Sequence, residues 1–135
     1  MIEALSKVFA AALRGYKPSR DLLVVDFGVF PWHKLLEVSA LKVGEEELNH
    51  PDEVAGWEDY AFASTSQKTM VAPDELLVWL LEQHETKNST VAFEAAANAV
   101  MSDDVQAALH ELPWAGEMRV QLVHPDSGKA YLGGK

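Results

Sequence analysis

Cysteine is absent from the sequence. The chain therefore has no disulfide bond and no thiolate, which excludes cysteine nucleophiles and cysteine-ligated metal sites. A cysteine-free chain is typical of the reducing cytoplasm, so we predict a cytoplasmic location. With 135 residues the chain is long enough to bury a hydrophobic core without a covalent staple. We predict one globular domain spanning residues 1–135.

Long hydrophobic runs are also missing. The strongly apolar run from Leu76 to Leu81 is far shorter than the roughly 18 residues that a membrane-spanning helix needs. Glu3 lies where an export signal carries positive charge, so residues 1–13 are not expected to form one. The sequence therefore predicts a soluble protein with no membrane partner.

Basic residues are scarce in the middle of the chain. The formal net charge is −10, and residues 43–86 contain 11 Asp or Glu but only one Lys. No Lys or Arg occurs between Lys42 and Lys68. Binding to nucleic acid or to an anionic membrane surface needs clustered Lys and Arg. The charge distribution argues against both kinds of partner.

The hydrophobic spacing predicts a mixture of helices and strands. Apolar residues recur at helical spacing in residues 2–14, and Pro73 suits the first position of a helix over 73–86. The alanine-rich residues 89–101 are expected as a helix, although residues 90–93 are also compatible with a strand. Ser102 is an expected N-cap for a further helix. Alternation predicts a hairpin of strands over 21–30 and 34–43 and a second hairpin over 117–124 and 129–132. Residues 57–62 are expected as a short strand or a turn. This order predicts an α+β fold with a small, mostly antiparallel sheet of about four strands packed against three to four helices.

Sequence motifs for catalysis and cofactor binding are missing. The chain has no Gly-x-Ser-x-Gly, no phosphate-binding loop, no Gly-x-Gly-x-x-Gly and no calcium loop. None of its five histidines lies four residues from another, as a helical zinc site would require. We therefore assign no catalytic residue and expect neither a metal nor a cofactor.

Asp26 is the candidate titratable group because it lies within an apolar strand. Burial there would raise its pKa, as in many acid–base sites. Alternation places it opposite Val25, Phe27 and Val29, which favours a simpler interpretation as a surface residue of a half-covered sheet. The turn that follows carries exposed or core-capping aromatics. A pocket at this end of the sheet would be lined by Asp26, Phe30, Trp32 and His33.

The acidic segment with its aromatic residues is the candidate for partner binding. Concentrated negative charge accelerates association with positively charged partners, and Trp and Tyr are frequent interface anchors. An alternative is a solvated loop whose aromatic residues pin it to the core. The predicted contact residues are Glu45, Glu46, Glu47, Asp52, Glu53, Trp57, Glu58, Asp59 and Tyr60.

Three functions from different classes remain open on the sequence. The leading hypothesis is a binding module for a basic protein, such as an inhibitor or immunity-type protein that neutralises a cationic toxin or nuclease. The first alternative is a small enzyme or small-molecule-binding protein with a pocket between sheet and helices. The second alternative is a homo-oligomeric accessory subunit that associates through the helix containing Leu76 to Leu81.

Overall fold

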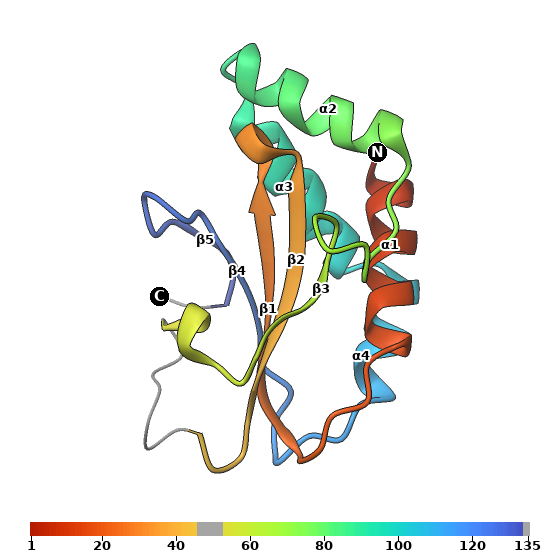
Figure 1. Cartoon of the computed structure of the whole chain (residues 1–135), viewed down its shortest axis with the longest axis vertical. Helices are drawn as coiled ribbons and strands as arrows, with labels where there is room; N and C mark the ends of the chain where they lie inside the picture. The colour runs from red at the N-terminus through yellow and green to blue at the C-terminus, as the bar shows by residue number, and fades with distance from the viewer. Residues whose placement is uncertain (46–52, 134–135) are drawn as a thin grey trace.

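A computed structural model of the protein describes residues 1–45 and 53–133. This part of the chain folds into a five-stranded sheet, four α-helices and two short 3₁₀ helices (Figure 1). The predicted α+β class is confirmed, and the sheet has one strand more than the four expected. The strand order is β3-β2-β1-β4-β5.

The central hairpin is the one predicted from the alternating pattern. It comprises β1 (Leu22–Phe30) and β2 (Leu35–Lys42), paired antiparallel and joined by the 3₁₀ turn η1 (Pro31–His33). Pro31 ends the strand because it has no N–H to donate, and its fixed φ suits the first position of a helical turn. Lys34 then closes the turn in the left-handed region, with φ of 52°.

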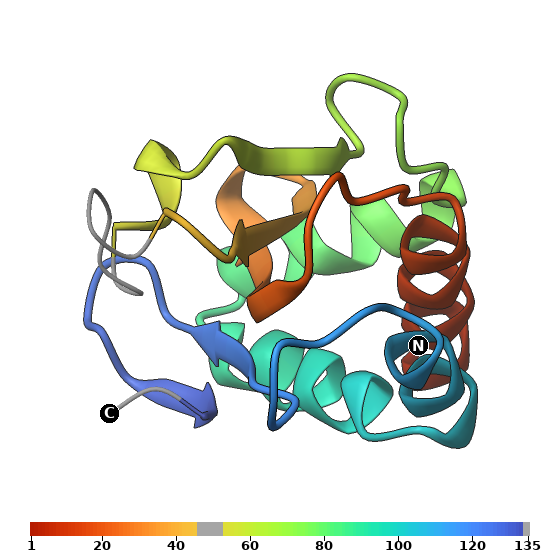
Figure 2. The same ribbon diagram turned by 90° about the horizontal axis from the view of Figure 1, so that it is seen from below.

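One face of the sheet is covered by helices. α1 (Ile2–Arg14), α3 (Ser89–Val100) and α4 (Asp103–His110) pack together on this side (Figure 2). The alternating residues Val25, Phe27 and Val29 of β1 all point into this core and are fully buried. The rings of Phe27 and of Phe9 from α1 pack edge to face with 5.0 Å between their centroids, and this contact joins the helical layer to the sheet.

The helix that contains the apolar run lies elsewhere. α2 (Asp74–Glu85) crosses the end of the sheet beside η1 (Figure 1). Leu76 and Leu80 are fully buried, whereas Val78 is 49% exposed and Leu77, Trp79 and Leu81 are half-buried. The run is therefore buried along one stripe only. No helix in the described ranges 1–45 and 53–133 is long and apolar enough to cross a membrane.

The last two strands form the second predicted hairpin, but they join the sheet in an unpredicted way. β4 (Val120–Val123) and β5 (Ala130–Leu132) pair antiparallel with each other, while β4 lies parallel to β1. Consecutive hairpins favour antiparallel pairing throughout. The chain passes through α2, α3 and α4 before β4, and such a helical crossover returns it in the direction of β1.

Candidate functional site

The outer face of the sheet, on the side away from α1, α3 and α4, carries two enclosed carboxylates with raised pKa values, Asp26 and Glu37. Residues that oppose the core on β1 point to this side, and the register aligns Asp26 with Ser39 of β2 and Gln121 of β4. A small apolar cluster of Val24, Leu41 and Trp57 covers one end of this face. The polar residues therefore occupy the middle of the sheet, between that cluster and η1.

Asp26 lies in the centre of the outer face. Gln121 Nε2 donates a hydrogen bond of 2.9 Å to its Oδ1. Burial raises the pKa of Asp26 to about 6; the hydrogen bond from Gln121 opposes this shift and the charge of Glu37 adds to it. Alternation thus predicted the correct face, but the position is more enclosed than the surface of a half-covered sheet. Asp26 can exchange a proton close to neutral pH.

Glu37 of β2 is the second carboxylate of this face. Its register partner on β1 is Gly28, two residues along the strand from Asp26, so the two carboxylates are diagonal neighbours. Glu37 is 9% exposed, and burial raises its pKa, while a hydrogen bond of 3.2 Å from the hydroxyl of Tyr60 acts against this shift. Burial and the charges of Glu37 and Asp26 also raise the pKa of Tyr60.

Within the described residues this carboxylate pair has no counter-charge. Among residues 1–45 and 53–133, no Lys, Arg or His nitrogen lies within ion-pair distance of Asp26 or Glu37. Two neighbouring carboxylates that are removed from water without a cation are destabilised in their ionised form. An ammonium or guanidinium group arriving from outside would relieve that cost.

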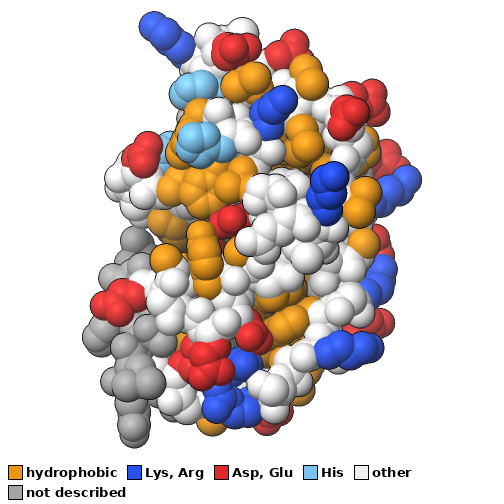
Figure 3. Space-filling view, viewed as in Figure 1, with side chains coloured by type: hydrophobic (Ala, Val, Ile, Leu, Met, Phe, Trp, Pro, Cys, Tyr) orange, Lys and Arg blue, Asp and Glu red, His pale blue; other side chains and the backbone are white. Residues whose placement is uncertain are grey.

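Aromatic side chains continue the outer face toward η1. Phe30 and Trp32 meet edge to face at 6.2 Å, and a Cβ atom at Gly28 would lie 3.0 Å from the ring of Phe30. The absence of a side chain at Gly28 thus lets Phe30 lie over the strand. Figure 3 shows hydrophobic side chains gathered on this side below a group of histidines, with an acidic side chain among them.

Histidine side chains surround Trp32. The rings of His33, His84 and His124 lie 6.2, 5.8 and 6.0 Å from that of Trp32, centroid to centroid. They come from η1, from α2 and from the residue after β4, which the sequence gives no reason to bring together. They are not arranged as ligands: in residues 1–45 and 53–133 no three His, Asp or Glu are placed to hold a metal ion.

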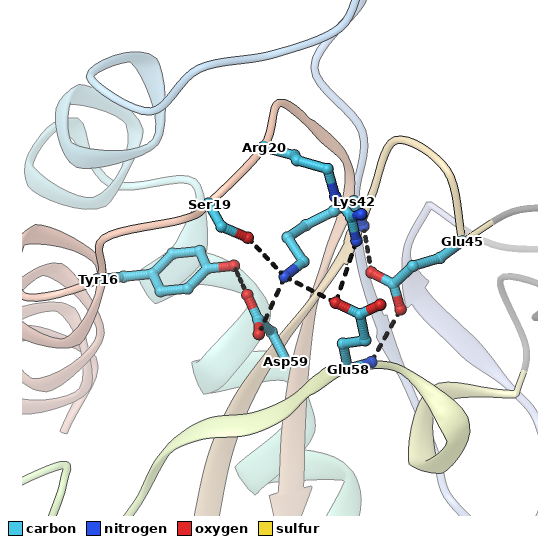
Figure 4. Close-up of polar contacts among 7 residues, drawn as sticks. All are labelled: Tyr16, Ser19, Arg20, Lys42, Glu45, Glu58 and Asp59. Carbon is cyan, nitrogen blue, oxygen red and sulfur yellow. Dashed lines mark hydrogen bonds and ion pairs between the residues drawn. The ribbon is translucent and has the colours of Figure 1, made fainter.

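Several predicted contact residues of the acidic segment are used inside the protein. The carboxylate of Glu45 is buried and accepts hydrogen bonds of 2.8 Å from the backbone N–H of Lys42 and of Glu58 (Figure 4). Trp57 is 3% exposed and forms the centre of the small apolar cluster over Val24 and Leu41. These two side chains attach the segment to the sheet.

Lys42 forms ion pairs with two further residues of the acidic segment, Glu58 and Asp59. Its ammonium group, 5% exposed, lies 3.2 Å from Glu58, 3.4 Å from Asp59 and 3.0 Å from Ser19 Oγ (Figure 4). Hydrogen bonds from Lys42 and Arg20 lower the pKa of Glu58. The hydroxyl group of Tyr16 donates a hydrogen bond to the carboxylate of Asp59.

The remaining predicted residues differ in position. Tyr60 is 43% exposed on the outer face, and Glu53 and the outer edge of Glu58 are also at the surface. Glu46, Glu47 and Asp52 lie outside the described residues.

An open hollow of about 760 Å³ occurs between α1 and the segment before α2, lined by residues that include Ala4, Val8 and Val71. None of Asp26, Phe30, Trp32 or His33 lines it.

Sequence reasoning did not name Glu37 or Gln121 as site residues. Alternation had placed Glu37 opposite Leu36 and Val38, so its face was available from the sequence. The missing information was the pairing of β4 with β1, which brings Gln121 to Asp26.

The chain matches no protein-family model, no curated protein and no solved structure. Function is therefore inferred from the geometry of the site.

Proposed function

We propose that this protein is a binding module that receives a basic segment of a partner protein on the outer face of its sheet. The observation that carries the proposal is the pair Asp26 and Glu37, two neighbouring carboxylates without a cation in the described part of the protein. A partner's Lys or Arg side chain would supply the missing charge. Arg would add paired hydrogen bonds to a carboxylate.

The aromatic surroundings of the pair support the same class of partner. Tyr60 flanks the carboxylates on one side, and Phe30 and Trp32 lie beyond Gly28 on the other. Aromatic faces attract ammonium and guanidinium groups, and their area also anchors the apolar stem of a Lys or Arg side chain. An acidic face with aromatic anchors is suited to a basic protein surface more than to a simple ion.

The overall charge supports a role in fast association. The net charge of −10 attracts a basic partner before contact, and Glu53 presents its carboxylate at the surface. An inhibitor or immunity-type protein that neutralises a cationic toxin or nuclease would use these properties. In this proposal Glu45 and Trp57 support the binding surface and do not touch the partner.

The test uses a hexalysine peptide as a probe and hexaglutamine as its uncharged control. The ¹⁵N-labelled protein is titrated at about 0.15 M salt, where long-range charge attraction is largely screened. We expect shifts concentrated at Asp26, Glu37, Tyr60 and Gln121 and a weaker affinity for Glu37→Gln. The matched variant Glu94→Gln, which removes an exposed charge from α3, should bind as the wild type does. Shifts spread over the helices, or equal losses in both variants, would reject the proposal.

A second candidate function has one observation in its favour. With a pKa of about 6, Asp26 can act as a general acid or base near neutral pH, and Glu37 and Tyr60 lie beside it. A small enzyme or small-molecule-binding protein would use these groups on a bound ligand. Under this function a small neutral ligand, and not hexalysine, would shift the same resonances.

Self-association through α2 is the remaining alternative, and sedimentation of Val78→Asp beside the wild type tests it.

A further inference from the structure

The arrangement of Asp26 and Glu37 couples any cation at the outer face to protons. Both carboxylates lie on one face of adjacent strands, and each receives one described side-chain hydrogen bond, from Gln121 and from Tyr60. Neither has a cation among residues 1–45 and 53–133. A proton is then the small positive charge that can reduce their mutual repulsion when no partner is bound.

We infer that a basic side chain of the partner and a proton compete for the Asp26–Glu37 pair, so that the outer face binds its partner in neutral solution and releases it in mildly acidic solution. The inference rests on the proposed function, to which it adds regulation by pH. The bound group is a Lys or Arg side chain, and its arrival expels a proton from the pair.

The strongest influence on Asp26, its burial, favours this exchange. Burial and the charge of Glu37 raise the pKa of Asp26 to about 6, against the hydrogen bond from Gln121. From β3, Tyr60 faces the pair as a neutral phenol whose own pKa is raised. From β4 the facing group is the uncharged amide of Gln121, and the opposite face of β1 is the apolar core. A cation at the pair would lower the pKa of Asp26 and release its proton.

The histidines around Trp32 are a second source of pH dependence that the experiment must separate. His33, His84 and His124 lie around Trp32, and a positive charge on any of them would repel a cation near Phe30 and Trp32. A dependence due to the histidines would remain when Asp26 is replaced. A dependence due to Asp26 would vanish.

The experiment measures hexalysine affinity by calorimetry from about pH 5 to 7.5, in buffers of different ionisation enthalpy that report proton release. With a pKa of about 6, the wild type should bind about tenfold more weakly at the acidic end. Asp26→Asn should bind more weakly than the wild type in neutral solution, with a change of less than about twofold over the range. Glu94→Gln should keep the full tenfold dependence. Wild-type binding near pH 6.5 should release a fraction of a proton, and Asp26→Asn should release none.

Two outcomes separate failure of the inference from failure of the proposed function. Hexalysine binding that maps to the outer face but keeps the same pH dependence in Asp26→Asn overturns the inference and leaves the proposed function standing. Absence of binding at the outer face at every pH overturns both. A difference in folding is detected by recording the amide spectrum of Asp26→Asn, and Glu37→Gln provides a second variant of the same pair.

Discussion

Gln121 donates a hydrogen bond to the carboxylate of Asp26 across the parallel pair of strands β4 and β1, although the two residues are 95 positions apart in the chain. This contact lies in the centre of the outer face and opposes the rise in the pKa of Asp26 that burial causes. The amide supplies one donor and no charge. The carboxylate is thus held in place without an ion pair to any residue in the described part of the chain.

Asp26→Asn is expected to stabilise the protein in neutral and alkaline solution. The pKa of Asp26 is higher in the folded protein, about 6, than in the unfolded chain, so folding is favoured by the proton and this contribution is lost as the pH rises from about 4 through 6. An Asn side chain still accepts the bond from Gln121 and carries no charge. Urea denaturation at about pH 8 should show a gain on the order of 2 kcal/mol.

The same variant should have little effect at about pH 3.5, where Asp26 is protonated in the wild type. Glu94→Gln serves as the control and should change stability by less than about 0.5 kcal/mol at either pH. A loss of stability for Asp26→Asn at pH 8 would contradict the assignment of Asp26 as a destabilising charge.

Lys42→Met is expected to destabilise the fold strongly. The substitution keeps the length of the side chain but leaves Asp59 without its cation in a partly buried position. Removing one partner of such a pair costs about 2–4 kcal/mol, which urea denaturation would measure. Lys17→Met removes an exposed positive charge and should change stability by less than about 0.5 kcal/mol. Similar values for the two variants would show that the Lys42 network contributes little.

Glu45→Ala separates a structural role from a role in contacting the partner. It leaves the backbone N–H groups of Lys42 and Glu58 without their acceptor, which should cost about 2–3 kcal/mol of stability. Because Trp57 lies beside this contact, its fluorescence should report the loosening. Glu53→Ala, at an exposed position, should leave stability unchanged within about 0.5 kcal/mol. If Glu45→Ala instead kept full stability and lost hexalysine binding, Glu45 would be a contact residue.

Gly28→Ala tests the aromatic part of the site. The new methyl group would meet the ring of Phe30 at 3.0 Å, and the ring can swing away because it is the far end of a side chain. Stability should change by less than about 1 kcal/mol, since alanine also reduces the entropy of the unfolded strand. Hexalysine affinity should fall because Phe30 no longer lies over the strand. Unchanged affinity together with a displaced Phe30 ring, seen by NMR, would exclude Phe30 from the binding surface.

The local elements of this fold were predictable because each depends on a short sequence pattern. Period-two alternation defined β1 and β2 to within one residue, and Pro31 marked the turn between them. Ser102 was predicted as the N-cap of α4, and its hydroxyl does accept from the backbone of that helix. Pattern, propensity and turn chemistry act over a few residues, so no distant contact was needed to infer these elements.

The acidic segment shows where sequence reasoning reaches its limit. The charges of Glu58 and Asp59 are evident from the sequence, but their availability depends on Lys42, whose ammonium group reaches both from the end of β2. A charged residue is available to a partner only where the protein itself does not neutralise it. The sequence gives the number of charges but not the distances between them.

The sequence by itself determined the α+β class, the two hairpins, the helices and the excess of negative charge, because these follow from local periodicity and composition. Tertiary structure decided the parallel pairing of β4 with β1, which follows from the helical connection through α2, α3 and α4 that returns the chain beside β1. That pairing brings Gln121 beside Asp26, and the adjacent register brings Glu37 to the same face. The pKa of Asp26 depends on burial and on these neighbours, so it is a property of the packed sheet and not of the strand alone.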